Sequence, residues 1–136
     1  MRKFTAEQVS ELNSKLKTPS EALKWALDNL HPKLALASSF GAEDVVVIDM
    51  LMKINPKARI FTLDTGRLNQ ETYDVMDEIR KKYNTNIEVT FPDAEEVIEM
   101  VRVNGMNLFY DSPGNRKLCC GIRKVHPLNK MLGTLD

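Results

Sequence analysis

Apolar and polar residues alternate along the chain in two patterns, one typical of helices and one of short buried strands. Two helices are predicted first, and each begins with the spacing of a capping box, at Thr5 and at Thr18. Apolar residues then recur at helical intervals, and Pro32 ends the second helix. Residues 1–31 are therefore expected to form two leading helices.

Three apolar runs of strand length follow, and a helical pattern comes after each. The expected order is strand 34–38, helix 43–54, strand 59–63, helix 71–83, strand 86–90 and a helix from Pro92 to Gly105. Short strands that alternate with helices predict an α/β fold, with an open parallel sheet flanked by helices. Helix 43–54 is apolar on nearly every side, so we expect it to be buried.

Length and charge restrict the class of protein further. The chain has 136 residues, which fits one domain over residues 1–136, and it carries 19 basic and 19 acidic side chains. This balance gives no electrostatic reason to expect nucleic-acid binding. No apolar run approaches the ~20 residues that span a bilayer, and residues 1–9 lack the apolar core of a signal peptide. We expect a cytoplasmic protein that binds neither nucleic acid nor membranes.

Polar loops follow the predicted strands at the edge where open α/β sheets bind ligands. In the first loop, 38–44, the hydroxyls of Ser38 and Ser39 precede the free amides of a helix start, and together they can hold an anion. Glu43 and Asp44 would repel a phosphate there unless they face away or contact a ribose. The alternative is an ordinary strand-to-helix turn in which Ser39 caps the helix.

The second loop, 64–67, reads Asp-Thr-Gly-Arg and follows the second predicted strand. Arg67 can grip a phosphate or sulfate through two parallel hydrogen bonds, and Asp64 can accept a hydrogen bond from a sugar or a base amine. Asp-Thr-Gly is also a common turn sequence, so an ordinary turn remains the alternative.

The third segment, 115–124, contains the two cysteines of the chain, Cys119 and Cys120, among four basic side chains. A positive environment favours the thiolate, and with it metal ligation or reactivity. The alternative is a pair of small buried side chains beside a solvated basic stretch. Adjacent cysteines bridge each other only in a strained ring, so we expect reduced thiols. With His126 they supply at most three ligands, too few for a four-coordinate zinc site.

Taken together, these segments resemble the assimilatory adenylyl-sulfate and 3′-phosphoadenylyl-sulfate reductase family. The resemblance rests on Ser-Ser-Phe-Gly-Ala-Glu-Asp at 38–44, Leu-Asp-Thr-Gly-Arg at 63–67 with Glu-Thr-Tyr after it, and Cys-Cys-Gly-Ile-Arg-Lys-Val at 119–125 with Pro-Leu after it. It extends over residues 33–133. The fold that it implies is the adenine-nucleotide α-hydrolase-like fold, which the family shares with the PP-loop pyrophosphatases.

The resemblance also implies a site. The residues expected to line the nucleotide pocket are Ser38, Ser39, Gly41, Glu43, Asp44, Leu63, Asp64, Thr65, Gly66 and Arg67. Arg123 and Lys124 would neutralise the sulfate and tune a nearby cluster. Cys119 and Cys120 would be two of the four ligands of a [4Fe-4S] cluster, which marks the subgroup that usually prefers adenylyl sulfate.

The reaction implied by the family is the thioredoxin-dependent reduction of adenylyl sulfate to sulfite and AMP in sulfate assimilation. A cysteine thiolate attacks the sulfur, AMP leaves, and an S-sulfocysteine remains on the enzyme. Thioredoxin or glutaredoxin then attacks the S-sulfocysteine and sulfite departs. The expected partners are therefore adenylyl sulfate or AMP and a thiol reductant, and a homo-oligomeric state is left open.

Several features of the family have no match in residues 1–136. These are an arginine-bearing loop, a second cysteine pair for the cluster, and a Glu-Cys-Gly-Leu-His element that carries the nucleophile. His126 also stands where an acidic residue is common. We therefore expect a truncated form of the fold, the nucleotide-binding portion without a catalytic residue of its own.

Two other functions remain open at this stage. One is a non-catalytic adenine-nucleotide-binding or metal-binding module that acts with a partner chain, for example with two cysteine pairs meeting across a homodimer axis. The other is an ATP pyrophosphatase of the PP-loop group. The sequence argues against the latter, because Ser-Phe-Gly-Ala-Glu-Asp at 39–44 replaces that group's Ser-Gly-Gly-x-Asp-Ser loop.

The polypeptide of residues 1–136 is predicted to release no sulfite from adenylyl sulfate in the presence of thioredoxin. The reason is that neither Cys119 nor Cys120 matches the family's attacking thiolate. The measurement is sulfite formed per mole of chain, with a complete reductase of the family as the positive control. Sustained sulfite release by the purified chain would contradict the expectation.

Overall fold

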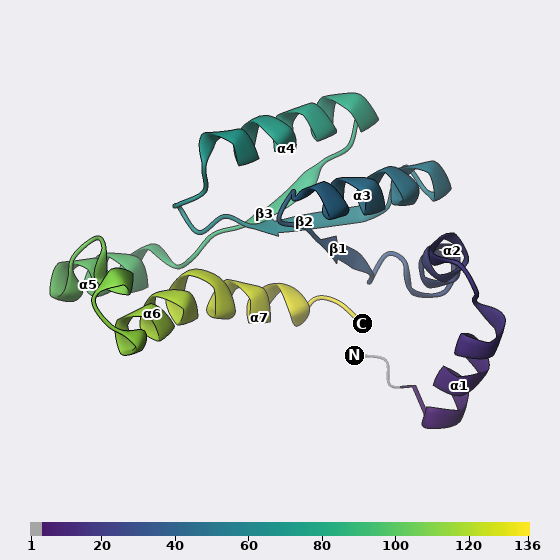
Figure 1. The fold of residues 1–136 in the computed structure, drawn as a ribbon, viewed down its shortest axis with the longest axis horizontal. Coiled ribbons are helices and arrows are strands. Elements are labelled where there is room, and N and C mark those ends of the chain that lie inside the picture. Colours follow the sequence, from purple (N-terminus) through teal and green to yellow (C-terminus); the bar gives the residue numbers. More distant parts are fainter. Residues whose placement is uncertain (1–3) are drawn as a thin grey trace.

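The computed structural model describes residues 4–136, which form a three-stranded parallel sheet with helices on its two faces (Figure 1). The elements are α1 (Ala6–Lys15), α2 (Pro19–Leu30), β1 (Ala35–Ala37), α3 (Ala42–Ile54), β2 (Arg59–Leu63), α4 (Gln70–Tyr83), β3 (Ile87–Thr90), α5 (Ala94–Asn104), the 3₁₀-helix η1 (Leu108–Tyr110), α6 (Pro113–Cys120), the π-helix η2 (Gly121–Val125) and α7 (His126–Leu132).

The two leading helices form as predicted, and both predicted capping boxes are present. The Thr5 and Thr18 hydroxyls accept hydrogen bonds from the backbone three residues on, and the side chains of Gln8 and Glu21 accept from the cap backbone in return. These pairs satisfy amides that a helix start otherwise leaves without a partner. Within this predicted stretch, residues 1–3 lie outside the described residues.

The sheet has the order β1-β2-β3, and both pairings are parallel. Leu36 lies opposite Ile60, and Phe61 lies opposite Glu88. The predicted α/β fold with an open parallel sheet is therefore confirmed. The first strand is shorter than predicted, since it ends at Ala37 and the chain turns into a loop at Ser38.

The main core lies between the sheet and helices α3 and α4. Ile48 and Leu51 of α3, Ile60 of β2 and Ile79 of α4 are buried there together. The prediction that helix 43–54 is buried holds for Ile48, Leu51 and Met52 but not for Val46, which is 60% exposed. A helix that covers one face of a sheet leaves its outer side free, and that side of α3 faces solvent.

A second, smaller core joins the helices of the C-terminal part. Met100 of α5, Leu108 of η1 and Cys119 of α6 are buried against one another. From there η2 and α7 run back beneath the sheet toward α2 (Figure 1). The backbone N–H of Asp136 donates to the Lys33 oxygen at 2.9 Å, so the end of the chain meets the start of the sheet. No helix within residues 4–136 has the length and apolar character needed to cross a membrane.

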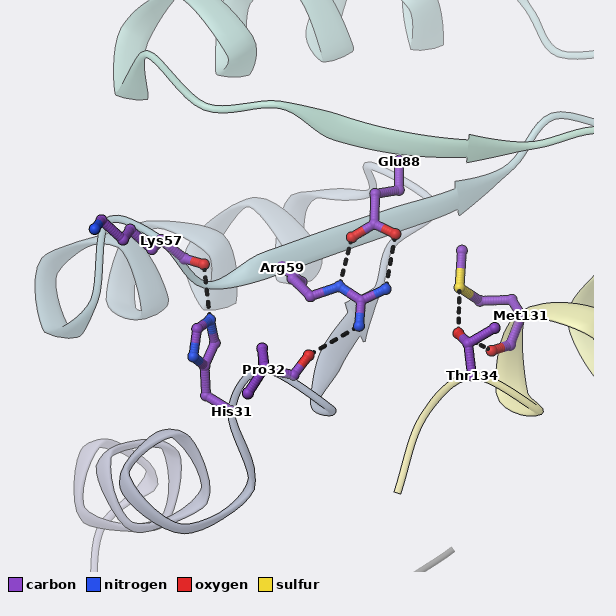
Figure 2. Close-up of polar contacts among 7 residues, drawn as sticks. All are labelled: His31, Pro32, Lys57, Arg59, Glu88, Met131 and Thr134. Carbon is purple, nitrogen blue, oxygen red and sulfur yellow. Dashed lines mark hydrogen bonds and ion pairs between the residues drawn. The ribbon is translucent and has the colours of Figure 1, made fainter.

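An ion pair connects the beginnings of the strands (Figure 2). The Arg59 guanidinium donates to both carboxylate oxygens of Glu88, at 2.6 and 2.8 Å, and to the Pro32 oxygen at 2.8 Å. His31 lies beside it at the end of α2, with Nε2 3.0 Å from the Lys57 oxygen. One arginine thus ties β2 to β3 and to the segment before β1.

Glu88→Gln is predicted to lower the free energy of unfolding by about 1 kcal/mol near neutral pH. The hydrogen bond from Arg59 holds the pKa of Glu88 below its ordinary value. The ion pair therefore stabilises the folded state fully at pH values above the ordinary pKa of Glu88. The effect is lost as the pH falls through the lowered pKa of the folded state. Arg59 stays protonated throughout, because the same contact raises its pKa.

The measurement is urea unfolding of both chains at about pH 7 and about pH 3, where the difference should shrink toward zero. Glu78→Gln is the matched control, since Glu78 is exposed on α4. A Glu88→Gln effect that is equal at both pH values would contradict the role of the ion pair.

Candidate functional site

A cavity of about 510 Å³ opens where β1 and β2 end, a volume typical of small-ligand sites. All three predicted segments reach it, because Ser39, Thr65 and Lys124 share its lining. The expectation that these loops meet at one edge of the sheet is therefore confirmed. The predicted site residues in the lining are Ser38, Ser39, Asp44, Leu63, Thr65, Arg67 and Lys124.

Five predicted residues lie outside this lining, namely Gly41, Glu43, Asp64, Gly66 and Arg123. Conversely, five residues that do line the cavity were not predicted as site residues from the sequence: Ala37, Phe61, Thr62, Leu68 and Thr72. Most of these residues flank the two loops, so their position at the end of a strand could have identified them as residues of the cavity. Thr72 belongs to the Glu-Thr-Tyr motif that follows the second loop.

Asp44 organises the first loop from within. Its Oδ2 accepts hydrogen bonds from the Ser39 N–H at 2.6 Å, from the Ser39 hydroxyl at 2.9 Å and from the Ser38 hydroxyl at 3.4 Å. The carboxylate thus takes the place at these donors that an anionic ligand was expected to occupy. We had expected Asp44 either to face away from a phosphate or to contact a ribose, and its contact with its own loop is a third arrangement.

The alternative role of Ser39, as a helix cap, was also wrong. Gly41 is the N-cap of α3, and it provides no side-chain hydrogen bond to the first turn. Phe40 is buried, and its φ of 62° lets the chain turn sharply between Ser39 and Gly41. The start of α3 therefore keeps amides without a side-chain cap, directly beside the loop.

Asp64 builds the second loop and is buried beneath it. Its Oδ1 accepts from the Gly66 N–H at 2.8 Å, and the Tyr73 hydroxyl donates to both carboxylate oxygens at 3.0 Å. Burial, followed by the bond to Asp64, raises the pKa of Tyr73, so its hydroxyl stays a donor. Asp64 thus shapes the turn and lies outside the lining of the cavity, and its predicted contact with a sugar or base stays a prediction.

Arg67 lines the cavity, but its guanidinium reaches to the segment after α5. Nη1 donates to the Met106 oxygen and Nη2 to the Asn107 side chain, both at 3.0 Å. The guanidinium also lies 4.7 Å from the centre of the Phe109 ring. Both terminal nitrogens are bound to the protein, so the predicted grip on a phosphate or sulfate is not formed in this arrangement.

The two basic residues of the third segment have different positions. Lys124 is exposed and lines the cavity, so its ammonium is free to meet a ligand. Arg123 is buried, and its Nη1 donates to the Thr65 oxygen at 2.6 Å. Its guanidinium thus binds the backbone of the second loop from outside the lining of the cavity, and the expectation that it neutralises the sulfate stays a prediction.

The two cysteines lie at the end of α6, and their side chains differ in burial. Cys119 is buried in the second core, whereas Cys120 is exposed. His126 does not join them, because its Nδ1 lies 2.9 Å from Glu96 Oε2. Within residues 4–136, no three His, Cys, Asp or Glu side chains are grouped closely enough to hold a metal ion.

A [4Fe-4S] cluster takes four thiolates, and this chain contains two. One of the two is packed among apolar side chains, so residues 4–136 do not by themselves form the site of a cluster.

Comparison with known proteins agrees with the geometry of the site. The model of the phosphoadenosine phosphosulfate reductase domain matches residues 33–136. Over 117 residues the chain is 42% identical to adenosine 5′-phosphosulfate reductase of Pseudomonas aeruginosa, which covers 85% of the chain. Over 128 residues, 93% of the chain, it is 43% identical to the chloroplastic 5′-adenylylsulfate reductase 3 of Arabidopsis thaliana.

The fold agrees as well. The crystal structure of phosphoadenylyl-sulfate reductase from Candida auris in a phosphate complex superposes with a TM-score of 0.79 at 25% identity, over 98% of this chain and 66% of that one. The chain spans 42% of the length of the bacterial relative and 27% of the plant relative. On the match over residues 33–136, this chain belongs to the phosphoadenosine phosphosulfate reductase domain family.

Proposed function

We propose that the cavity at the ends of β1 and β2 binds adenylyl sulfate, and that the chain is the nucleotide-binding portion of a cytoplasmic, thioredoxin-dependent adenylyl-sulfate reductase. One observation carries the proposal: segments far apart in the sequence, each bearing a motif of the family, line the same cavity. The relatives named above are adenylyl-sulfate reductases, which supports this substrate.

Different residues of the lining suit different parts of such a ligand. Phe61, Leu63 and Leu68 provide apolar wall for an adenine base. The Lys124 ammonium supplies the positive charge that a phosphosulfate needs, and the Thr65 and Thr72 hydroxyls supply hydrogen bonds. Amides at the start of α3 add partial positive charge at the same edge of the sheet.

In the proposed reaction, the cavity holds the phosphosulfate while a cysteine thiolate from outside residues 1–136 attacks its sulfur. The sulfur–oxygen bond to AMP breaks, and AMP leaves with the bonding electrons. A thiol of thioredoxin or glutaredoxin then attacks the cysteine sulfur of the S-sulfocysteine, so that its bond to the sulfonate breaks, sulfite leaves and a mixed disulfide forms. The second thiol of the reductant resolves this disulfide and restores the cysteine. The positive charge of Lys124 stabilises the negative charge on the leaving group.

Cys119 and Cys120 have a separate place in the proposal. We assign them as two of the four ligands of a [4Fe-4S] cluster, whose other two thiolates would come from outside this chain. The exposed Cys120 lies at the surface from which such ligands would approach. With its four thiolates, such a cluster would carry a net negative charge, which the basic residues of this segment would partly neutralise.

The chain is predicted to bind both AMP and adenylyl sulfate, and Lys124→Ala is predicted to weaken either affinity about tenfold, as the loss of one charged contact does. Titration calorimetry measures both affinities. Lys81→Ala is the matched control, because Lys81 is exposed in the last turn of α4. Failure of the unsubstituted chain to bind either nucleotide would overturn the proposal, as would equal binding by the Lys124→Ala chain.

A further inference from the structure

Arg123 is a buried cation whose guanidinium binds the backbone of the second loop. It is 8% exposed and lies outside the lining of the cavity. Its Nη1 has the Thr65 oxygen as acceptor, but its Nε is buried without any hydrogen-bond partner. Within residues 4–136, no carboxylate forms an ion pair with it. Burying a charge so incompletely paired is unfavourable, so its position needs a reason other than stability.

Gly66 shows how closely the second loop fits this guanidinium. Its φ is +71°, a conformation that glycine adopts readily and other residues rarely. A Cβ at this position would lie 3.3 Å from Nη1 of Arg123. The glycine therefore allows both the turn and the close approach of the arginine to it.

The same loop is held at its other end by Arg67, which binds the segment after α5. Thr65 is the point at which Arg123 holds the loop, and its Oγ1 accepts from the Arg67 N–H at 3.3 Å. Thr65 and Arg67 both line the cavity. A shift of the Thr65 backbone would therefore move two lining residues at once.

We infer that Arg123 is a positioning residue, which holds the Thr65 carbonyl and through it the shape of the nucleotide cavity, without contacting the ligand. The inference rests on the proposed function in that the ligand is an adenine nucleotide. The two adjacent basic residues thus have different roles: Lys124 faces the ligand, and Arg123 holds the loop that faces the ligand.

Arg123→Met separates this role from a merely structural one. Methionine keeps an unbranched apolar stem but removes the charge and the hydrogen bond to Thr65. Replacing an incompletely paired buried charge with an apolar side chain of similar size is often neutral or stabilising. A positioning role therefore predicts weaker binding at equal or higher thermal stability, a combination that a structural role does not produce.

The experiment measures AMP affinity by titration calorimetry and the melting temperature of the same chains. Arg123→Met should lower the affinity at least about tenfold while the melting temperature stays equal or rises. Arg123→Lys keeps a charged donor, and it should restore the affinity to within about threefold of the unsubstituted chain. Arg80→Met is the control, because Arg80 is exposed near the end of α4, away from the cavity.

Two results would overturn the inference. One is an Arg123→Met chain that binds AMP as the unsubstituted chain does. The other is a loss of affinity that comes with a lower melting temperature and is not restored by lysine. Hydrogen exchange of residues 63–69 tests the loop without a ligand: faster exchange in Arg123→Met supports the positioning role, and unchanged exchange contradicts it. If the unsubstituted chain binds no AMP, the proposed function fails, and this exchange measurement still decides the role of Arg123.

Discussion

The parallel pairing of β2 with both of its neighbours is the constraint on which the position of the cavity depends. Because β1 and β2 run in the same direction, the loops that follow them leave the sheet at the same edge. That edge carries the serine loop and the Asp-Thr-Gly-Arg loop, and η2 brings Lys124 to it from the other end of the chain. The cavity is a consequence of this topology, since its three groups of residues are distant in the sequence.

The polar side chains at this edge fall into two groups with different tasks. Asp44, Asp64 and Arg123 bind backbone or neighbouring side chains and thereby give the loops their shape. Thr65 and Lys124 face the cavity on the framework that the first group builds. Charged residues of the family motifs can therefore matter without lining the cavity, because several of them determine the positions of the residues that do line it.

Local patterns were sufficient to predict the strands, the capping boxes and the loops at the edge of the sheet, because each depends on neighbours within a few residues. The partners of Arg67 and Arg123 could not be predicted in this way. Arg67 binds Met106 and Arg123 binds Thr65, across 39 and 58 positions of the chain. The role of Asp44 was missed for another reason, since a carboxylate near a helix start suits the helix dipole equally well whether or not it binds its own loop.

The cavity at the ends of β1 and β2 is proposed to bind an adenine nucleotide. Titration of isotope-labelled chain with AMP, followed through the backbone amide resonances, tests this proposal most directly. Binding in this cavity should shift the resonances of Ser39, Thr65 and Lys124 most and leave that of Val9 in α1 unchanged. Shifts confined to the region of Arg59 and Thr134, where a separate cavity lies on the side of α7, would contradict the account.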